Sequence, residues 1–385
     1  MTMEGDSKTR RRFLQSAGGM AAASAALAQS ADGATPGIEL LETRVVSWQD
    51  DLYHGWPTVA RRKDGSLIAA WSGRREAHVC PFGTVEVMHS TDEGETWTFP
   101  RTIHDGPIDD RDAGALETAQ GTLLVTSFSS LAYDDYYLKK GKYTDRADWM
   151  AVHHRLPDET SRAAELGEWA FRSTDGGVTW SRRIHTIVNS PHGPIQLADG
   201  RLLYAGKRLW DDEKRIGVCE SSDDGLTWSW LAEIPTREGD RFTDYHELHA
   251  VECADGSILV QVRNHNAANK GETLQCRSTD GGATWSPPES IGVWGLPSQL
   301  LRLRDDRLIM SYGYRREPFG NQARISDDHG ATWSEPLTIS GDGIGSDLGY
   351  PSTVELSDGT LLTLWYEKMA DHPKAVLRQA KWRLV

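Results

Sequence analysis

The chain has 385 residues and a formal net charge of −14 at pH 7, with 56 acidic side chains against 42 basic ones. An acidic surface of this size keeps a protein in solution and opposes binding to nucleic acid or anionic lipid. Any acidic ligand must therefore be held by a local group of basic side chains.

Residues 1–28 are similar to a twin-arginine export signal. Three arginines precede Phe13 and Leu14, an alanine-rich stretch follows, and Ala26 to Ala28 is a typical cleavage site. An ordinary secretory leader or a disordered basic tail is the alternative. The segment carries four basic and two acidic side chains, so the remaining chain has a net charge near −16. We expect residues 29–385 to be periplasmic or secreted, without a membrane span, because no other apolar run is long enough.

An eight-residue motif, Ser-x-Asp-x-Gly-x-Thr-Trp, occurs five times. The copies are Ser90–Trp97, Ser173–Trp180, Ser221–Trp228, Ser278–Trp285 and Ser326–Trp333. Each copy is typical of a tight hairpin turn, since Asp accepts backbone N–H groups and Gly adopts a positive φ. The spacings of 83, 48, 57 and 48 residues fall mostly near the period of a propeller blade.

A second repeat predicts the number of blades. Turns of the Asp-Gly-x-Leu type, each followed by an apolar strand, begin at Asp64, Gln120, Asp199, Asp255, Asp305 and Asp358. Five of the six precede a copy of the longer motif, and the sixth lies near the C-terminus. We expect an N-terminal strand at 40–48 to complete the last blade, which closes the ring and removes free sheet edges. The prediction is an all-β, six-bladed β-propeller over residues 29–385.

The longer motif resembles the Asp-box of the sialidase (neuraminidase) superfamily. The resemblance covers nearly the whole mature chain and implies a sialidase-like propeller. It identifies the fold more than the reaction, because Asp-boxes are turns that lie away from the catalytic mouth.

Residues 132–169 interrupt the repeat in the second blade. Their composition favours a helix near 160–166, and insertions in repeat folds often lie at the rim of the binding face. This one is either a lid or a solvated surface excursion.

Four cysteines are present, and Cys219 and Cys276 take equivalent places in neighbouring blades. We expect them to be buried fillers rather than a disulfide. No Cys-x-x-Cys or His-rich spacing occurs, so the sequence predicts no metal and no cofactor.

Positions that face the mouth of the ring can be compared between blades, because the first strand of each blade lies along the axis. Eight residues before the turns stand Trp56, Asp112, Pro191, Glu247, Pro297 and Tyr350. Ionisable groups there are costly unless paired or used. The predicted site therefore includes Asp112, Glu247 and Tyr350, with His192 one position further on and Arg111 and His246 alongside.

The strand after each turn returns to the same end of the blade. Its last residues are predicted to bind substrate, and they include Arg74, Arg263, Arg315, Arg316 and Glu367. The planar fork of arginine matches a carboxylate in two hydrogen bonds. A ring of such groups suits recognition of an anionic sugar, although structural ion pairs would give the same pattern.

The sialidase resemblance extends to individual residues. The segment Tyr350 to Gly359 is similar to the one that carries the nucleophilic tyrosine, and Glu247 to Glu252 is similar to the stretch whose first glutamate activates it. Arg263 matches the second arginine that binds the substrate carboxylate, and Arg315 or Arg316 is a third. Glu367 lies where the family keeps a glutamate that steadies an active-site arginine.

Two positions depart from the family pattern. Gly55 stands where the first carboxylate-binding arginine belongs, and the acid/base aspartate expected after Arg74 is replaced by His78 or Glu76.

The resemblance implies an exo-acting glycoside hydrolase. Tyr350 would attack the anomeric centre, Glu247 would be its base, and His78, or Asp112 as second choice, would protonate the leaving oxygen. Two alternatives remain open: a polysaccharide lyase in which Tyr or His abstracts the proton next to a uronate carboxylate, and a non-catalytic carbohydrate-binding propeller. In each case the expected partner is a carbohydrate.

Overall fold

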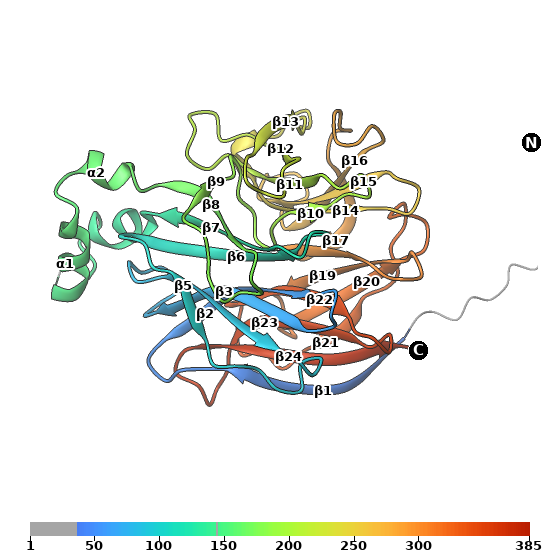
Figure 1. Cartoon of the computed structure of the whole chain (residues 1–385), viewed down its shortest axis with the longest axis horizontal. Helices are drawn as coiled ribbons and strands as arrows, with labels where there is room; N and C mark the ends of the chain where they lie inside the picture. The colour runs from blue at the N-terminus through green and yellow to red at the C-terminus, as the bar shows by residue number, and fades with distance from the viewer. Residues whose placement is uncertain (1–36, 144) are drawn as a thin grey trace, which may run out of the picture. The chain divides into compact units, whose positions relative to one another are not determined.

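The computed structural model describes residues 37–143 and 145–385, and the predicted export signal at 1–28 lies outside them. Six four-stranded antiparallel sheets form the blades of a β-propeller (Figure 1). Blades 1 and 2 hold β2 (Tyr53–Arg61), β3 (Leu67–Arg75), β4 (Thr84–Ser90) and β5 (Arg101–His104), then β6 (Asp109–Glu117), β7 (Leu123–Ser130), β8 (Gly167–Ser173) and β9 (Ile184–His185). Blades 3 and 4 hold β10 (Ile195–Gln196), β11 (Leu202–Lys207), β12 (Ile216–Ser221) and β13 (Ser229–Glu233), then β14 (Tyr245–Glu252), β15 (Ile258–Asn264), β16 (Glu272–Ser278) and β17 (Glu289–Trp294). Blades 5 and 6 hold β18 (Ser298–Arg302), β19 (Leu308–Tyr314), β20 (Gly320–Ser326) and β21 (Leu337–Ser340), then β22 (Leu348–Glu355), β23 (Leu361–Lys368), β24 (Ala375–Leu384) and β1 (Ile38–Ser47).

The N-terminal strand closes the ring, as predicted. Strand β1 pairs antiparallel with β24, from Ile38 opposite Leu384 to Ser47 opposite Leu377, and is the outer strand of blade 6 (Figure 1). In the other five blades a hairpin joins the third and fourth strands, and the Asp-box lies in that hairpin. Blade 6 has no such hairpin because its fourth strand comes from the other end of the chain. Six blades therefore carry five Asp-boxes.

Each Asp-box is a hydrogen-bonded turn of the predicted kind. In the first, Asp92 accepts from the backbone N–H of Thr96 at 2.9 Å and from its hydroxyl at 2.6 Å, while the Ser90 hydroxyl accepts from the N–H of Gly94 at 2.8 Å. Gly94 has φ of 82°, a conformation that glycine adopts at little cost. The same bonds recur in the box of blade 3, around Asp223.

Apolar side chains from adjacent blades interlock and form the core. Between blades 3 and 4, Leu203 and Val218 pack in one cluster with Leu248 and Val260, and all four are buried. Burying one such side chain contributes about 1.5–3 kcal/mol. All four cysteines are buried and free, as expected for Cys219 and Cys276.

The insertion in blade 2 forms a π-helical turn, η1 (Asp134–Leu138), and two short helices, α1 (Ala147–Arg155) and α2 (Glu159–Ala163), to one side of the blades (Figure 1). It ends before Gly167, where β8 begins. Glu76 anchors it to blade 1 by accepting hydrogen bonds from Arg146 at 2.6 Å and from the Trp149 indole at 2.7 Å. Within the described part of the chain, none of the helices is long and apolar enough to cross a membrane.

Candidate active site

Bulges in the inner strands place side chains in the mouth of the ring. The register between first and second strands shifts after Gly55 in β2, after Arg111 in β6 and after Gly349 in β22. The next residues are Trp56, Asp112 and Tyr350, whose φ values are 56°, 48° and 54°. A left-handed conformation costs a residue with a side chain about 1–2 kcal/mol, and a bulge redirects the side chain. Three of the six positions in the column found in the sequence are thus strained bulges.

Tyr350, Glu247 and Arg263 form a compact hydrogen-bonded group. The Tyr350 hydroxyl donates to Glu247 Oε1 at 2.6 Å, and Arg263 Nη1 donates to Glu247 Oε2 at 2.5 Å and to the Tyr350 oxygen at 3.2 Å. Tyr350 is only 5% exposed. The sequence-predicted nucleophile, base and arginine therefore lie in direct contact, although they come from blades 4 and 6.

The charges in this group keep the tyrosine proton in place. Burial alone would raise the pKa of Glu247, but the Arg263 charge and the hydrogen bonds from Tyr350 and Arg263 outweigh it and lower the pKa to about 2. Burial and the nearby Glu247 charge raise the pKa of Tyr350 well above its usual value. At rest the pair is a phenol and a carboxylate, and the carboxylate can accept the proton when the phenol oxygen attacks.

Two further arginines lie beside this group. The Arg315 guanidinium carbon is 5.7 Å from the centre of the Tyr350 ring, and that of Arg111 is 4.4 Å from the Trp56 ring. The Trp56 and Tyr350 rings are in turn 6.3 Å apart. Arg315 Nη2 and Arg111 Nη1 are buried without a hydrogen-bond partner among the described residues. Arg111 Nη1 lies 3.6 Å from Asp109 Oδ2 and is therefore ion-paired, so of these two arginines Arg315 alone offers an unused N–H donor to an anion.

The structure does not bring Arg74 or Arg316 to Tyr350, and both assignments are corrected. Successive side chains on a strand point in opposite directions, so only one of two adjacent arginines faces the axis. Arg74 is exposed and lines a different hollow, with Glu76 and Arg155, whereas Arg316 stacks on Trp294 at 3.7 Å.

The inward member of the first arginine pair is Arg75. It is fully buried, pairs with Asp109 at 2.7 Å and lies 4.8 Å from the Trp56 ring. The Asp109 charge outweighs burial and raises the pKa of Arg75 further. Arg75 therefore packs against the Trp56 ring and is not a contact for a ligand.

Glu367 also lies apart from the site, contrary to its predicted role in substrate binding. It is 1% exposed, pairs with Arg378 at 2.8 Å and accepts from the Trp365 indole at 2.8 Å. It steadies an arginine of β24, inside blade 6, and not one of the mouth arginines.

His78 belongs to a second polar cluster on the other side of Trp56. Its Nδ1 is 3.0 Å from Asp347 Oδ1 and 2.9 Å from the Tyr53 hydroxyl, and its ring is 5.0 Å from the Trp56 ring. The Tyr53 hydroxyl donates to the same Asp347 oxygen at 2.8 Å. Burial lowers the pKa of His78, and the bond to Asp347 offsets part of that effect. Tyr53 and Asp347 were not predicted from the sequence. The one feature that could have indicated them is that they precede Trp56 and Tyr350 by three residues.

Asp112 shares a hollow of about 150 Å³ with Glu247, Lys207 and His246. It is 6% exposed, and burial together with the nearby Glu247 charge raises the pKa of Asp112 to about 7. His246 lies on the wall of this hollow with its ring 4.4 Å from that of His265, and burial lowers the pKa of His246 to about 4. The hollow is a niche beside the tyrosine group that holds one carboxyl group partly protonated at neutral pH, Asp112, and one carboxylate, Glu247.

His192 lies behind Tyr350 rather than in the hollow. It is 2% exposed, its Nδ1 is 3.2 Å from the Thr58 hydroxyl, and its ring is 6.5 Å from that of Tyr350. Burial lowers the pKa of His192 well below its usual value. It is therefore a neutral packing group behind the tyrosine and not a contact for substrate, which corrects the prediction.

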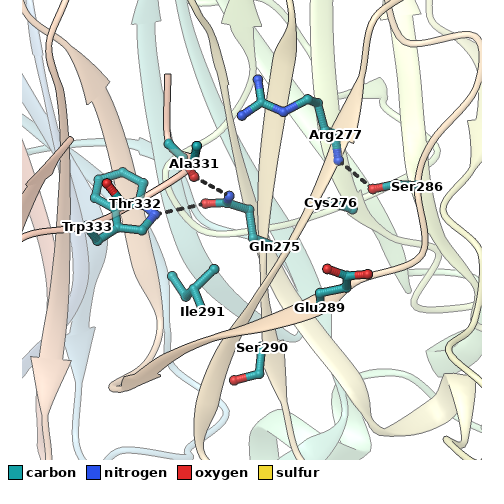
Figure 2. Close-up of a pocket in the computed structure, with 11 residues that line it drawn as sticks. Gln275, Cys276, Arg277, Ser286, Glu289, Ser290, Ile291, Ala331, Thr332 and Trp333 are labelled. Carbon is teal, nitrogen blue, oxygen red and sulfur yellow. Dashed lines mark hydrogen bonds between the residues drawn. The ribbon is translucent and has the colours of Figure 1, made fainter. Parts of the chain in front are cut away.

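A larger hollow of about 530 Å³ lies elsewhere, between blades 4 and 5. Figure 2 shows Gln275 in its wall, hydrogen-bonded to the Trp333 indole at 3.2 Å. The lining polar groups largely satisfy one another, and an Asp-box forms one side. Its size alone does not make it a catalytic site, since the tyrosine group lies at the axis.

The fold and the tyrosine–glutamate–arginine group together define a sialidase-like propeller. Residues 148–363 match the model of the BNR repeat-like domain family, and the chain belongs to this family. Among curated proteins it is 25% identical to a sialidase of Micromonospora viridifaciens over 255 residues, which cover 60% of this chain and 35% of that protein. It is also 25% identical to the xyloglucanase Xgh74A of Acetivibrio thermocellus over 211 residues, 49% of this chain and 22% of that protein.

Solved structures agree on the fold. A protein of unknown function from Dyadobacter fermentans superposes with a TM-score of 0.72 at 23% identity, covering 91% of this chain and all of that one. The Hadza microbial sialidase Hz136 superposes with a TM-score of 0.61 at 19% identity, covering 85% of this chain and 65% of that one. The chain spans less than half the length of the curated relatives described. It is a BNR-repeat propeller with the fold of the solved sialidase structures.

Proposed function

We propose that the protein is an exo-acting glycoside hydrolase that removes a terminal acidic sugar. The observation that carries the proposal is the contact of Tyr350 with both Glu247 and Arg263, at 2.6 and 3.2 Å. A phenol that hydrogen-bonds to a carboxylate base and a cation is prepared to become a nucleophile. A pure binding site has no need for such an arrangement.

In this mechanism the Tyr350 oxygen bonds to the anomeric carbon while its proton passes to Glu247. The bond to the leaving oxygen breaks, and that oxygen takes a proton from His78. Asp347 accepts a hydrogen bond from His78 Nδ1–H, which leaves Nε2 to carry the transferred proton. Water then attacks the glycosyl-tyrosine, His78 takes its proton, and Tyr350 recovers the one held by Glu247.

Asp112 is the second candidate for the proton donor. Its raised pKa, about 7, keeps a share of the carboxyl groups protonated at neutral pH, next to an ionised Glu247. Two acids whose environments separate their pKa values are typical of acid–base catalysis. Substitution of each residue, as set out in the Discussion, decides between the two.

An acidic substrate is supported by the arginines. Arg263, Arg315 and Arg111 lie beside the Tyr350–Trp56 pair, and Arg315 has an unused N–H group. Gly55 supplies no guanidinium where the superfamily pattern expects one. We therefore propose that Arg111 takes over part of the binding of the sugar carboxylate from the adjacent strand.

The test is the mass of the products from the mature protein with sialosides and uronate-containing oligosaccharides. Products that together exceed the substrate by one water establish hydrolysis, whereas an unsaturated product and no added water would establish a lyase. Tyr350→Phe should abolish turnover and preserve ligand binding. Tyr312→Phe is the matched control, because Tyr312 is also buried but bonds to Gln322 in blade 5. Unchanged turnover in Tyr350→Phe would refute the mechanism.

We further propose that the protein is exported. The support is the leader-like composition of residues 1–28 alone. Replacing Arg10 and Arg11 by Lys should retain the protein in the cytoplasm of a bacterial host that has the twin-arginine pathway. Export that continues unchanged would exclude that pathway.

A further inference from the structure

A cluster of three metal-binding side chains joins blades 4 and 5. Cys253 and Asp255 lie in the tight turn between β14 and β15, and His329 lies in the Asp-box of blade 5. One donor atom from each, a thiol sulfur, a carboxylate oxygen and an imidazole nitrogen, lies within 4.8 Å of the other two. This turn follows the end of β14 opposite to Glu247, so the cluster is remote from the mouth.

The equivalent Asp-box position in other blades shows what His329 lacks. Glu93 accepts hydrogen bonds from the Ser357 backbone and hydroxyl at 2.9 Å, and Asp224 accepts from Thr122 and Arg172 at 2.5 and 2.8 Å. Both carboxylates thereby join their box to the preceding blade. His329 Nδ1, in contrast, is buried and has no hydrogen-bond partner among the described residues. An imidazole nitrogen that has no hydrogen-bond partner and lies beside a thiol and a carboxylate is a typical metal ligand.

The other two donors are held in place, and the Cys253 thiol itself donates a long hydrogen bond of 3.7 Å to the His329 carbonyl. Cys253 is 1% exposed, and the turn is fixed by hydrogen bonds from its N–H to Ser257 and from Gly256 to its carbonyl. Asp255 Oδ1 accepts from the N–H and hydroxyl of Ser257 at 2.9 and 2.7 Å, which leaves Oδ2 unused. One orienting contact and one free oxygen on a carboxylate favour coordination, because the contact fixes the direction of the ligand.

Nearby charge is compatible with a divalent ion. Arg277 lies against the cluster, and its guanidinium donates to the His329 carbonyl at 2.6 Å and to the Ser257 hydroxyl at 2.5 Å. Figure 2 shows Arg277 at the hollow where the two blades meet. A thiolate and a carboxylate supply two negative charges, which balance one divalent cation.

We propose that Cys253, Asp255 and His329 bind one zinc-type divalent cation that ties blade 4 to blade 5. Mixed sulfur, nitrogen and oxygen donors suit zinc, and water would complete four-coordination. Binding replaces the S–H bond of Cys253 by a sulfur–metal bond, and the proton leaves to solvent. The site is independent of the proposed hydrolase reaction and stabilises the ring.

The test uses the purified mature protein, stripped by a chelator under reducing conditions and then titrated with zinc chloride. We expect one zinc per chain, one proton released, and a rise in Tm of about 4 °C at zinc about 100-fold above Kd. Cobalt in place of zinc should give a thiolate-to-cobalt charge-transfer band. That band is a direct readout of Cys253 ligation and needs no substrate.

Variants assign the site. Cys253→Ser and His329→Gln should each weaken zinc binding by about 100-fold or more. Cys276→Ser should not, because Cys276 is equally buried but its sulfur contacts only a carbonyl of β15. His329→Gln should match the wild-type Tm in chelator, which separates lost binding from lost folding. The proposal fails if the stripped protein binds no zinc, or if both variants bind it as tightly as the wild type.

Discussion

Replacing Glu247 by Gln tests the core of the proposed mechanism with a change of a few atoms. The amide keeps the size of the side chain but cannot accept the Tyr350 proton. General base assistance contributes about 10²–10⁴-fold to rate, so kcat should fall by about that factor, while KM changes little. The assay is hydrolysis of an aryl glycoside of the sugar found in the substrate panel.

The same substitution has a predicted effect on stability. In the folded protein the pKa of Glu247 falls from 4.5 to about 2, and such a shift corresponds to about 3 kcal/mol of stabilisation by Arg263 and Tyr350. For about 350 folded residues this equals a decrease in Tm of about 4 °C. The stabilisation is present above pH 4.5 and is lost as the pH falls toward 2. The Tm difference between wild type and Glu247→Gln should therefore shrink in acid.

Glu355→Gln is the matched control. Glu355 ends the same strand that carries Tyr350, pairs with Arg304 at 3.0 Å and lies at the other end of blade 6. It should leave kcat unchanged. A kcat for Glu247→Gln within about tenfold of the wild type would refute the assignment of Glu247 as the base.

Four further predictions concern the site and the turns. Arg315→Lys should raise KM by about tenfold or more with little change in kcat, because lysine cannot make a paired contact to a carboxylate; an unchanged KM would remove Arg315 from substrate binding. His78→Asn should slow the hydrolysis of substrates with poor leaving groups by about 10²-fold or more and leave the hydrolysis of activated aryl glycosides unchanged. If Asp112→Asn shows this pattern and His78→Asn does not, Asp112 is the proton donor. Burial raises the pKa of Asp112 to about 7 in the folded protein, so ionisation of this carboxyl lowers the free energy of unfolding as the pH rises from 4 through 7. Asp112→Asn should therefore raise Tm more at pH 8 than at pH 4. Equal changes in Tm at the two pH values would contradict the raised pKa of Asp112. Asp223→Ala should lower stability by about 1 kcal/mol without affecting kcat, as measured by thermal unfolding, and a loss of activity in the folded variant would contradict the placement of Asp-boxes away from the site.

The fold could be predicted from the sequence because each repeat is stabilised by interactions between residues close together in the chain. An Asp-box needs only eight consecutive residues, and its bonds, such as those of Asp92 to Thr96, span four positions. Counting turns then predicts the blades, and an unpaired last blade predicts the N-terminal strand. The sequence left open whether the insertion in blade 2 is a lid or a surface excursion, because the contacts that hold it join residues far apart in the chain. Glu76 holds Arg146 and Trp149 across 70 and 73 residues.

Site residues were predictable where the repeat determines them. The bulged column places Asp112, Glu247 and Tyr350 at equivalent points of their blades, so comparing positions identifies them without a structure. Residues at strand ends were less certain, because one residue of register decides whether Arg315 or Arg316 faces the axis. The proposed zinc-type cluster could not be predicted from the spacing of residues in the sequence, because Cys253 and His329 come from different blades. The prediction of no metal rested on local patterns alone.

The two departures from the superfamily pattern are one structural change. A side chain at Gly55 would place its Cβ 3.1 Å from the ring of Tyr53, so an arginine there would require the Tyr53 ring to shift by a few tenths of an ångström. Yet Tyr53 is held in place, because its hydroxyl bonds to both His78 and Asp347. The missing arginine at Gly55 and the histidine in place of the expected aspartate therefore depend on the same tyrosine. This connected cluster supports our proposal that Tyr350 and Glu247 carry the chemistry, while the contacts to the sugar around Gly55 and His78 differ from those of the superfamily pattern.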